Sequence, residues 1–449
     1  MRRRAMGREA EYGIVTLVGK QPHALPLSGM FPADLDCPSM FLPNGARFYI
    51  DINRHPEYAT GECDNAEDVM THALAGDEYV ARATQRLLVA ANRDPIDPFV
   101  ECEVYANNTC GFRAGVEDTF GTHVNLQIGV PADADTASLA GFAEPLIAFL
   151  VTSQIVLGAG RLRFNRQRQP RYELAQRSGF MDQVYALDTT SHRPIVNLRD
   201  EPHSDLKFGR RLHLILFDNP LFPQHIRLTF GVLDVLCTMR EEFRLAGLEL
   251  DNPVSAIRTI SQWPGQKVRL TNGRRLTAVE IQLHYIEQAL QFLGSYPRLC
   301  PQRHIVSEYH THLQRLQQSL EPEAHKGKLG WATKQVVLEG IRAKQPDITP
   351  DRLRAHELSM HQITGGHNSW RHRLRRYWEY DELAVKRALT EAPADTRAHA
   401  RGQLIRHPRY EGADWEGVNV AGRWYYLLDP LDNAVPELYP MPERQAEPA

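Results

Sequence analysis

The sequence predicts an α+β protein whose strands lie mainly in the first third of the chain and whose helices lie mainly in the middle. Residues 9–18 and 46–52 are rich in β-branched and aromatic residues and show the alternation of half-buried strands. Over residues 224–248 and 277–296, apolar residues recur at three- and four-residue spacing, which indicates helices buried on one face. Strand segments followed by helical segments are typical of the α+β class.

The other elements are predicted from the same patterns. Further strands are expected at 99–105, 123–128 and 210–217, and further helices at 65–91, 143–160 and 305–320. The apolar segment 143–160 contains Ser153 and Gln154 and is short for a membrane span, so we expect a buried helix there.

The tail of the chain differs in composition from the rest. From about residue 387 it is punctuated by proline and glycine, and residues 415–428 read as short strands. We therefore predict a large domain over residues 1–386 and a small C-terminal domain over residues 387–449. No internal repeat is evident in the sequence.

Composition narrows the classes of function. The net charge of −3 over 449 residues gives no general attraction to nucleic acid or to an anionic membrane. The six cysteines form no C-x-x-C pair, and no apolar signal-peptide core follows the basic N-terminus. These features predict a cytoplasmic protein that binds neither nucleic acid nor membrane; they leave its oligomeric state open.

Common nucleotide and metal motifs are absent. The run from Gly13 to Gly19-Lys20 is one residue too long for a phosphate-binding loop, and Gln21 stands where a hydroxyl should bind Mg²⁺. His310 and His312 lie two apart on a predicted helix and so face different sides. We expect them to be surface histidines and not metal ligands.

Carboxylates on predicted strands are the main chemical signal. A strand over residues 9–18 would direct Glu9 and Glu11 to one face, and a strand over 46–52 would place Arg47, Tyr49 and Asp51 together on one face. The loop at 55–64 adds three more carboxylates. Mg²⁺ prefers such oxygen ligands and often bridges to substrate phosphates, although an edge strand with a solvated charged face is the simpler alternative.

Two later segments carry polar side chains in similar patterns. His123 and Asn125 would share one strand face. Arg199, Arg210 and Arg211 stand near carboxylates, and arginines in such surroundings are suited to bidentate binding of phosphate or carboxylate. A surface ion-pair loop explains the arginines equally well.

Taken together, these segments resemble the family of the Pup ligase and the Pup deamidase/depupylase. The matching stretches occur along nearly the whole chain, in the order of the family, and they are residues 6–13, 44–64, 107–109, 121–125, 174–178, 193–205, 210–213, 250–258 and 396–402. The stretch 44–64, which contains N-G-A-R and H-P-E-Y-A-T-G-E-C-D, is the most specific of them. The resemblance implies a glutamine-synthetase-like fold, with a curved antiparallel sheet flanked by helices and a small C-terminal domain.

The resemblance also implies a role for individual residues. Asp51 corresponds to the catalytic aspartate of the family. Mg²⁺ ligands would be Glu9, Tyr49 and Glu57, and ATP contacts would be Arg47, Thr60 and Trp415. Possible additional site residues are Glu11, His123, Asn125, Arg199, Arg210 and Arg211.

The implied reaction is ATP- and Mg²⁺-dependent ligation of the C-terminal Glu of a Pup-like modifier to a lysine of a target protein. The short interval from Gly13 to Pro43 and the H-P-E-Y-A-T-x-E-C sequence resemble the ligase more than the depupylase. A deamidase/depupylase, a small-molecule amide ligase and an inactive modifier-binding homologue stay open. The chain departs from the family at Val124, which replaces a glutamate, and over residues 217–225 and 361–378.

Overall fold

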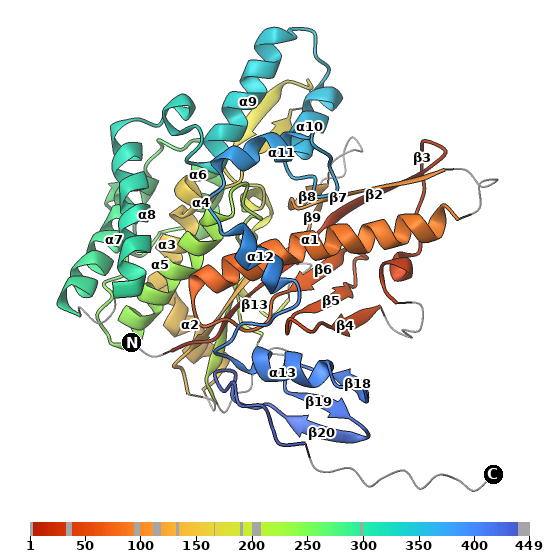
Figure 1. Cartoon of the computed structure of the whole chain (residues 1–449). Coiled ribbons are helices and arrows are strands. Elements are labelled where there is room, and N and C mark those ends of the chain that lie inside the picture. Colours follow the sequence, from red (N-terminus) through yellow and green to blue (C-terminus); the bar gives the residue numbers. More distant parts are fainter. Residues whose placement is uncertain are drawn as a thin grey trace, which may run out of the picture.

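The computed structural model describes residues 3–32, 38–93, 99–110, 118–131, 134–165, 167–188, 192–199, 208–296 and 300–438. Within these residues, eight strands form one sheet in the order β13-β14-β15-β10-β1-β6-β5-β4. Neighbouring strands are antiparallel, except that β13 and β14 are parallel. Long helices cover one side of this sheet, and a small helix-and-strand unit lies beside its β4–β6 end (Figure 1).

The strands of the large sheet are β1 (Met6–Glu11), β4 (Ser39–Phe41), β5 (Arg47–Ile50), β6 (Pro56–Ala59), β10 (Thr122–Ile128), β13 (Gln183–Ala186), β14 (Pro194–Asn197) and β15 (Arg210–Leu214). Shorter ribbons are formed by β2 (Gly13–Val18) with β3 (Gln21–Pro22) and β7 (Val100–Tyr105), by β8 (Thr109–Cys110) with β9 (Asp118–Thr119), by β11 (Arg161–Phe164) with β12 (Pro170–Glu173), and by β16 (Val268–Arg269) with β17 (Arg275–Leu276).

The helices are α1 (Ala66–Ala91), α2 (Thr136–Ala143), α3 (Ile147–Thr152), α4 (Gln154–Leu157), α5 (Gln224–Glu241), α6 (Pro253–Gln262), α7 (Ala278–Ser295), α8 (Cys300–Gln318), α9 (Gly330–Lys344), α10 (Pro350–Ser359), α11 (Trp370–Leu374) and α12 (Glu382–Ala388). Several of them begin with a capping residue, such as Asn65 before α1 and the Thr277–Glu280 capping box at α7. No helix among the described residues is long and apolar enough to cross a membrane.

Period-two alternation gives the sheet two chemically different faces. On β10, Val124 and Leu126 are buried in the main core, with Leu212 and Leu214 of β15 beside them. Residues of α3, α5 and α7 complete this core. Val124 is therefore a core residue that points away from His123, as the sequence predicts. The intervening residues form the opposite, polar face of the sheet.

Two local predictions about the helices are wrong. Helix α5 ends at Glu241 rather than near Leu248, because Phe243 takes a positive φ of 55° and the chain leaves the helix. Leu245 and Leu248 still pack on the main core, which explains why their spacing looked helical. His312 is not on the surface: it is 7% exposed, since it lies on the side of α8 that faces His225 of α5.

The small C-terminal unit has its own core. Helix α13 (Arg397–Ile405) packs on a sheet of β18 (Tyr410–Ala413), β19 (Gly417–Val420) and β20 (Arg423–Tyr426). Leu404, Val418 and Tyr425 are among the residues buried between them. Helix α12 packs instead on α1 of the large unit. The boundary at residue 387 stays a prediction.

A buried ion-pair cluster joins the small unit to the main sheet. Glu62, which follows β6, accepts hydrogen bonds at 2.7 Å from the guanidinium groups of Arg397 and Arg401. Arg401 also donates to the Gly45 carbonyl at 2.8 Å and lies over the Trp415 ring. Burial raises the pKa of Glu62, but the charges of Arg401 and Arg397 outweigh this and hold it at about 2. We refer to Glu62, Arg397 and Arg401 as the Glu62 clamp.

Candidate active site

Two adjoining cavities open on the polar face of the sheet. The larger, which we term the acidic cleft, has a volume of about 300 Å³ and is lined by the ends of β1, β5, β6, β10 and β15 and by nearby loops. The smaller, the Trp415 pocket, has a volume of about 90 Å³ and includes residues of the small unit. Glu9 and Arg211 line both cavities, so the two adjoin each other.

Three carboxylates meet on one side of the acidic cleft. Glu11, Asp51 and Glu57 each direct an oxygen to within 4.8 Å of the others. Strand register explains this arrangement, because Glu11 of β1 lies opposite Glu57 of β6, and Tyr49 of β5 lies opposite Glu57 from the other side. Burial and the charges of Glu11 and Glu9 raise the pKa of Glu57 far above its ordinary value, against the lowering effect of a hydrogen bond from Tyr49.

Asp51 stands at the end of β5, where the chain turns. Its carboxylate accepts a hydrogen bond from the backbone N–H of His55 at 2.6 Å. Burial and the charge of Glu11 raise the pKa of Asp51, although this hydrogen bond opposes the effect. A carboxylate with a raised pKa and a fixed orientation is suited to accept a proton from a substrate.

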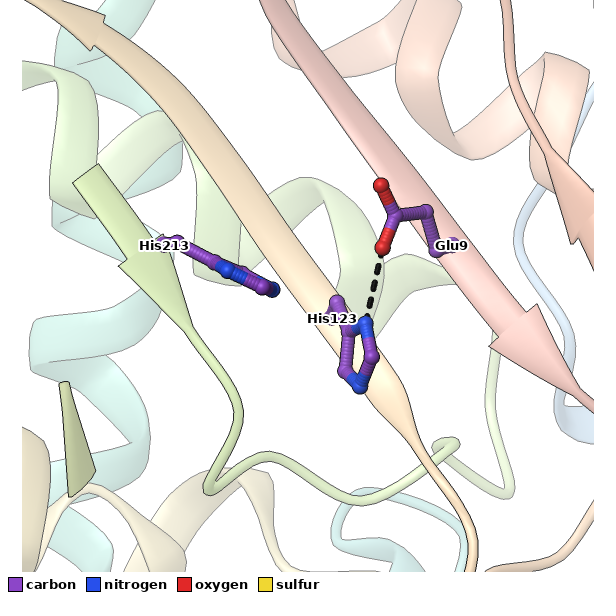
Figure 2. A group of neighbouring side chains, drawn as sticks. All are labelled: Glu9, His123 and His213. Carbon is purple, nitrogen blue, oxygen red and sulfur yellow. Dashed lines mark hydrogen bonds and ion pairs between the residues drawn. The ribbon is translucent and has the colours of Figure 1, made fainter. Parts of the chain in front are cut away.

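A second possible metal-binding group lies between β1, β10 and β15. Glu9, His123 and His213 offer ligand atoms within 4.8 Å of one another. Figure 2 shows the Glu9 carboxylate joined to Nδ1 of His123, at 2.7 Å, with the His213 ring directed toward them from the neighbouring strand. His213 is absent from the residues selected in the sequence analysis. The available signal was its position two residues after Arg211, on the same face of β15.

Arginines form another part of the wall of the acidic cleft. Arg177, Arg193, Arg199 and Arg211 all line it. Arg177 was missed by sequence reasoning; it is 2% exposed and donates to the carbonyl of Ile215 at 2.8 Å. Arg211 donates to the Arg199 carbonyl at 2.8 Å, which ties the two segments together.

Arg210 is placed differently from Arg211. Its guanidinium group donates to the carbonyl of Ala134, and the residue lines the Trp415 pocket but not the acidic cleft. The remainder of the segment around Arg199, residues 200–207, lies outside the described residues.

The Trp415 pocket brings six predicted residues together, among them Glu9, Arg210 and Arg211. Thr60, Asn125 and Trp415 all line it, and Arg397 of the Glu62 clamp does so as well. Among the residues that the structure describes, the buried Oδ1 of Asn125 has no hydrogen-bond partner. An aromatic ring beside hydroxyl, amide and guanidinium groups is a chemically reasonable site for a nucleotide.

Arg47 lies near both cavities without lining either. It donates to Oγ of Ser39 at 3.0 Å, and its guanidinium group stacks over the Tyr49 ring at 4.5 Å. Phe41 links this group to the small unit, since its ring lies 5.1 Å from that of Trp415. The grouping of Arg47, Tyr49 and Asp51 near one face is as the sequence predicts.

The carboxylate group fits a hard divalent cation. Glu11, Asp51 and Glu57 are all oxygen donors, as Mg²⁺ prefers. Within the described part of the chain, the buried Oε2 of Glu11 receives no hydrogen bond, although a buried carboxylate oxygen normally has a partner. A cation would satisfy this oxygen and offset the repulsion that raises the pKa of Glu57.

We therefore expect Glu57→Gln to raise the melting temperature of the metal-free protein at pH 8. Because the folded pKa of Glu57 is raised, stability is lost as the pH rises from the ordinary value of 4.5 toward the folded pKa, and glutamine removes this loss. The rise should be on the order of 1–2 °C in EDTA. Adding Mg²⁺ should stabilise the wild type more than the variant. Glu101→Gln, on the exposed side of β7, is the control. A lower melting temperature with an intact Mg²⁺ response would contradict the assignment.

The fold and the site define the class of protein. A sheet that carries carboxylates and arginines on one face, next to a pocket closed by a small C-terminal unit, is the architecture of a glutamine-synthetase-like ligase. This agrees with the fold that the sequence resemblance implied.

Comparisons with known proteins identify the family. A sequence model described as "Pup-ligase protein" matches residues 18–419. The chain is 34% identical over 412 residues to the Pup–protein ligase of Acidimicrobium ferrooxidans, covering 88% of this chain and 87% of that protein. The depupylase of Acidothermus cellulolyticus is 33% identical over 400 residues, covering 86% and 76% of the two chains. The chain belongs to the Pup-ligase family.

Solved structures agree with this assignment. The complex of the prokaryotic ubiquitin-like protein Pup with its ligase PafA matches with a TM-score of 0.82 and 26% identity, covering 96% of this chain and 90% of that one. PafA in complex with ADP matches with a TM-score of 0.74 and 26% identity, covering 89% and 88%.

Proposed function

We propose that this protein is an ATP- and Mg²⁺-dependent ligase that joins the C-terminal glutamate of Pup, or of a Pup-like modifier, to a lysine of a target protein. One observation carries the proposal: Asp51 and two further carboxylates share a cleft with four arginines, and that cleft adjoins the Trp415 pocket. The cytoplasm is the proposed location.

The Trp415 pocket would bind ATP. Thr60 and Trp415 line it, and the guanidinium group of Arg47 lies 5.8 Å from the ring of Phe41, which packs against Trp415. Because Glu9 and Arg211 line both cavities, the γ-phosphate would lie where the pocket meets the acidic cleft. Bound Mg²⁺, held by Glu9, Tyr49 and Glu57, would neutralise charge on the transferred phosphoryl group. Glu11 and His123 would be further ligands.

The reaction would take place in two steps. The side-chain carboxylate of the modifier's C-terminal glutamate attacks the γ-phosphorus of ATP, which gives an acyl phosphate and ADP. The lysine amine then attacks the acyl carbon, Asp51 takes a proton from the amine, and inorganic phosphate leaves as the amide bond forms. Arg199 and Arg211 would stabilise negative charge on the phosphoryl group or on the modifier.

Hydrolysis of the same isopeptide bond is the second candidate function. It is favoured by the depupylase of Acidothermus cellulolyticus, whose identity to this chain is 33%, close to that of the ligases. In that reaction Asp51 would either take a proton from the attacking water molecule or act as the nucleophile itself.

One incubation separates the two functions. Purified protein is mixed with ATP, Mg²⁺, Pup ending in glutamate and a lysine-bearing acceptor, and the products are followed by intact mass spectrometry. An adduct whose mass is that of Pup plus the acceptor minus one water, formed with release of ADP, supports the ligase function. Without an adduct, deamidation of Pup ending in glutamine, or release of Pup from a conjugate, would establish the hydrolase instead.

A further inference from the structure

An isoleucine is held outward at the rim of the acidic cleft. Ile52 follows Asp51 directly, is 96% exposed and belongs to the lining of the cleft. Ile50, half-buried on the preceding strand, lines the same cleft. Single exposed apolar residues are common on protein surfaces, but this one adjoins the proposed catalytic carboxylate.

The turn that carries Ile52 is well fixed. The backbone N–H of Asp51 donates to the His55 carbonyl at 3.0 Å, and that of Arg54 donates to the Asp51 carbonyl at 3.0 Å. Arg54 takes a positive φ of 66°, which non-glycine residues rarely adopt. The His55 ring stacks on Phe120 with 4.5 Å between centroids. These contacts hold the Ile52 side chain in solvent instead of against the protein core.

Charge is distributed unevenly around this rim. Ile50 and Ile52 flank Asp51, whose carboxylate belongs to the group formed with Glu11 and Glu57. The guanidinium-bearing residues of the cleft come from other segments, around Arg177, Arg193, Arg199 and Arg211. A cationic amine is drawn toward the carboxylates, and an anionic glutamate or phosphate toward the arginines. An amine that approaches the carboxylates on an apolar stem would therefore bring that stem past Ile52.

We propose that Ile52, supported by Ile50, contacts the aliphatic stem of the acceptor lysine and so selects primary amines on an unbranched hydrocarbon chain. The inference rests on the proposed ligase function. Packing the methylene groups of lysine on Ile52 removes apolar surface of both partners from water. The contact favours lysine over a small nucleophile that lacks a stem.

The test compares two nucleophiles for the same acyl phosphate. Nα-acetyl-lysine and hydroxylamine compete for modifier activated with ATP, and mass spectrometry measures the ratio of lysine adduct to hydroxamate. Ile52→Ser should lower the selectivity for lysine roughly fivefold, as expected for losing part of a buried aliphatic contact. Ile52→Leu should restore it. Val89→Ser, a 65% exposed valine of α1 outside the lining of both cavities, is the matched control.

The possible outcomes are distinct. An unchanged selectivity ratio in Ile52→Ser, or an equal fall in Val89→Ser, would overturn the role of Ile52 while leaving the ligase function standing. If the wild type forms neither adduct nor hydroxamate with ADP release, the ligase function fails, and the inference fails with it.

Discussion

Asp51→Asn should lower the rate of isopeptide formation by at least about 100-fold, because asparagine has the shape of aspartate but cannot accept a proton from the lysine amine. Asp51 is suited to this role by its surroundings: burial and Glu11 raise its pKa, and the N–H of His55 orients it. The side chain does not line the Trp415 pocket, so binding of ATP in the absence of Mg²⁺ should change little.

Two measurements check this expectation. Single-turnover formation of the Pup–lysine adduct gives the chemical rate, and fluorescence titration with a labelled nucleotide gives the affinity for ATP. Asp347→Asn, at an exposed position outside both cavities, controls for the loss of one negative charge. An Asp51→Asn enzyme that ligates at the wild-type rate would remove Asp51 from the mechanism.

Breaking the Glu62 clamp should have the largest effect on stability. Glu62→Ala leaves Arg397 and Arg401 buried with their main carboxylate partner removed, at 2% and 0% exposure. Removing one member of a buried ion pair typically costs about 3–5 kcal/mol. The small unit carries Trp415, so loss of the clamp should also weaken nucleotide binding. Urea denaturation, with and without ADP, measures both effects.

The pH dependence of the clamp follows from the pKa of Glu62. Because the folded pKa is held at about 2, below the ordinary value of 4.5, its stabilisation is complete above pH 4.5 and is lost as the pH falls toward 2. Glu62→Ala should therefore flatten the acid side of the stability profile. Glu78→Ala, which removes an exposed pair with Arg82, should cost only about 0.3–0.5 kcal/mol. Equal losses in the two variants would show that the clamp contributes little.

The local pattern of residues predicts which side chains share a strand face, but it does not predict which strands pair with one another. Period-two alternation correctly grouped Arg47 with Tyr49, and it placed Val124 opposite His123. It could not show that Glu11 lies opposite Glu57, because strand register depends on contacts between distant segments.

The functional residues that sequence reasoning missed share this property. His213 becomes a candidate metal ligand only when β15 pairs with β10. Arg177 lies on the loop after β12, and the fold of that loop brings it to the cleft. Glu62 was recognised as part of a motif, but its partners are more than three hundred residues away in the chain. For Asp51, Glu9, Thr60 and Trp415, the structure gives positions, and their roles stay predictions.

The composition of the Trp415 pocket has a consequence for how the protein is made. Its walls come from both ends of the described chain, with Ala5 and Glu9 on one side and Arg397, Trp415 and Pro430 on the other. Ribosomes add roughly 5–20 residues per second, and early segments can fold before later ones emerge. The acidic cleft can thus be assembled on a nascent chain that still lacks its nucleotide pocket. The nucleotide pocket would then be completed only after Trp415 and Pro430 have emerged, and a chain terminated before them would lack a complete pocket.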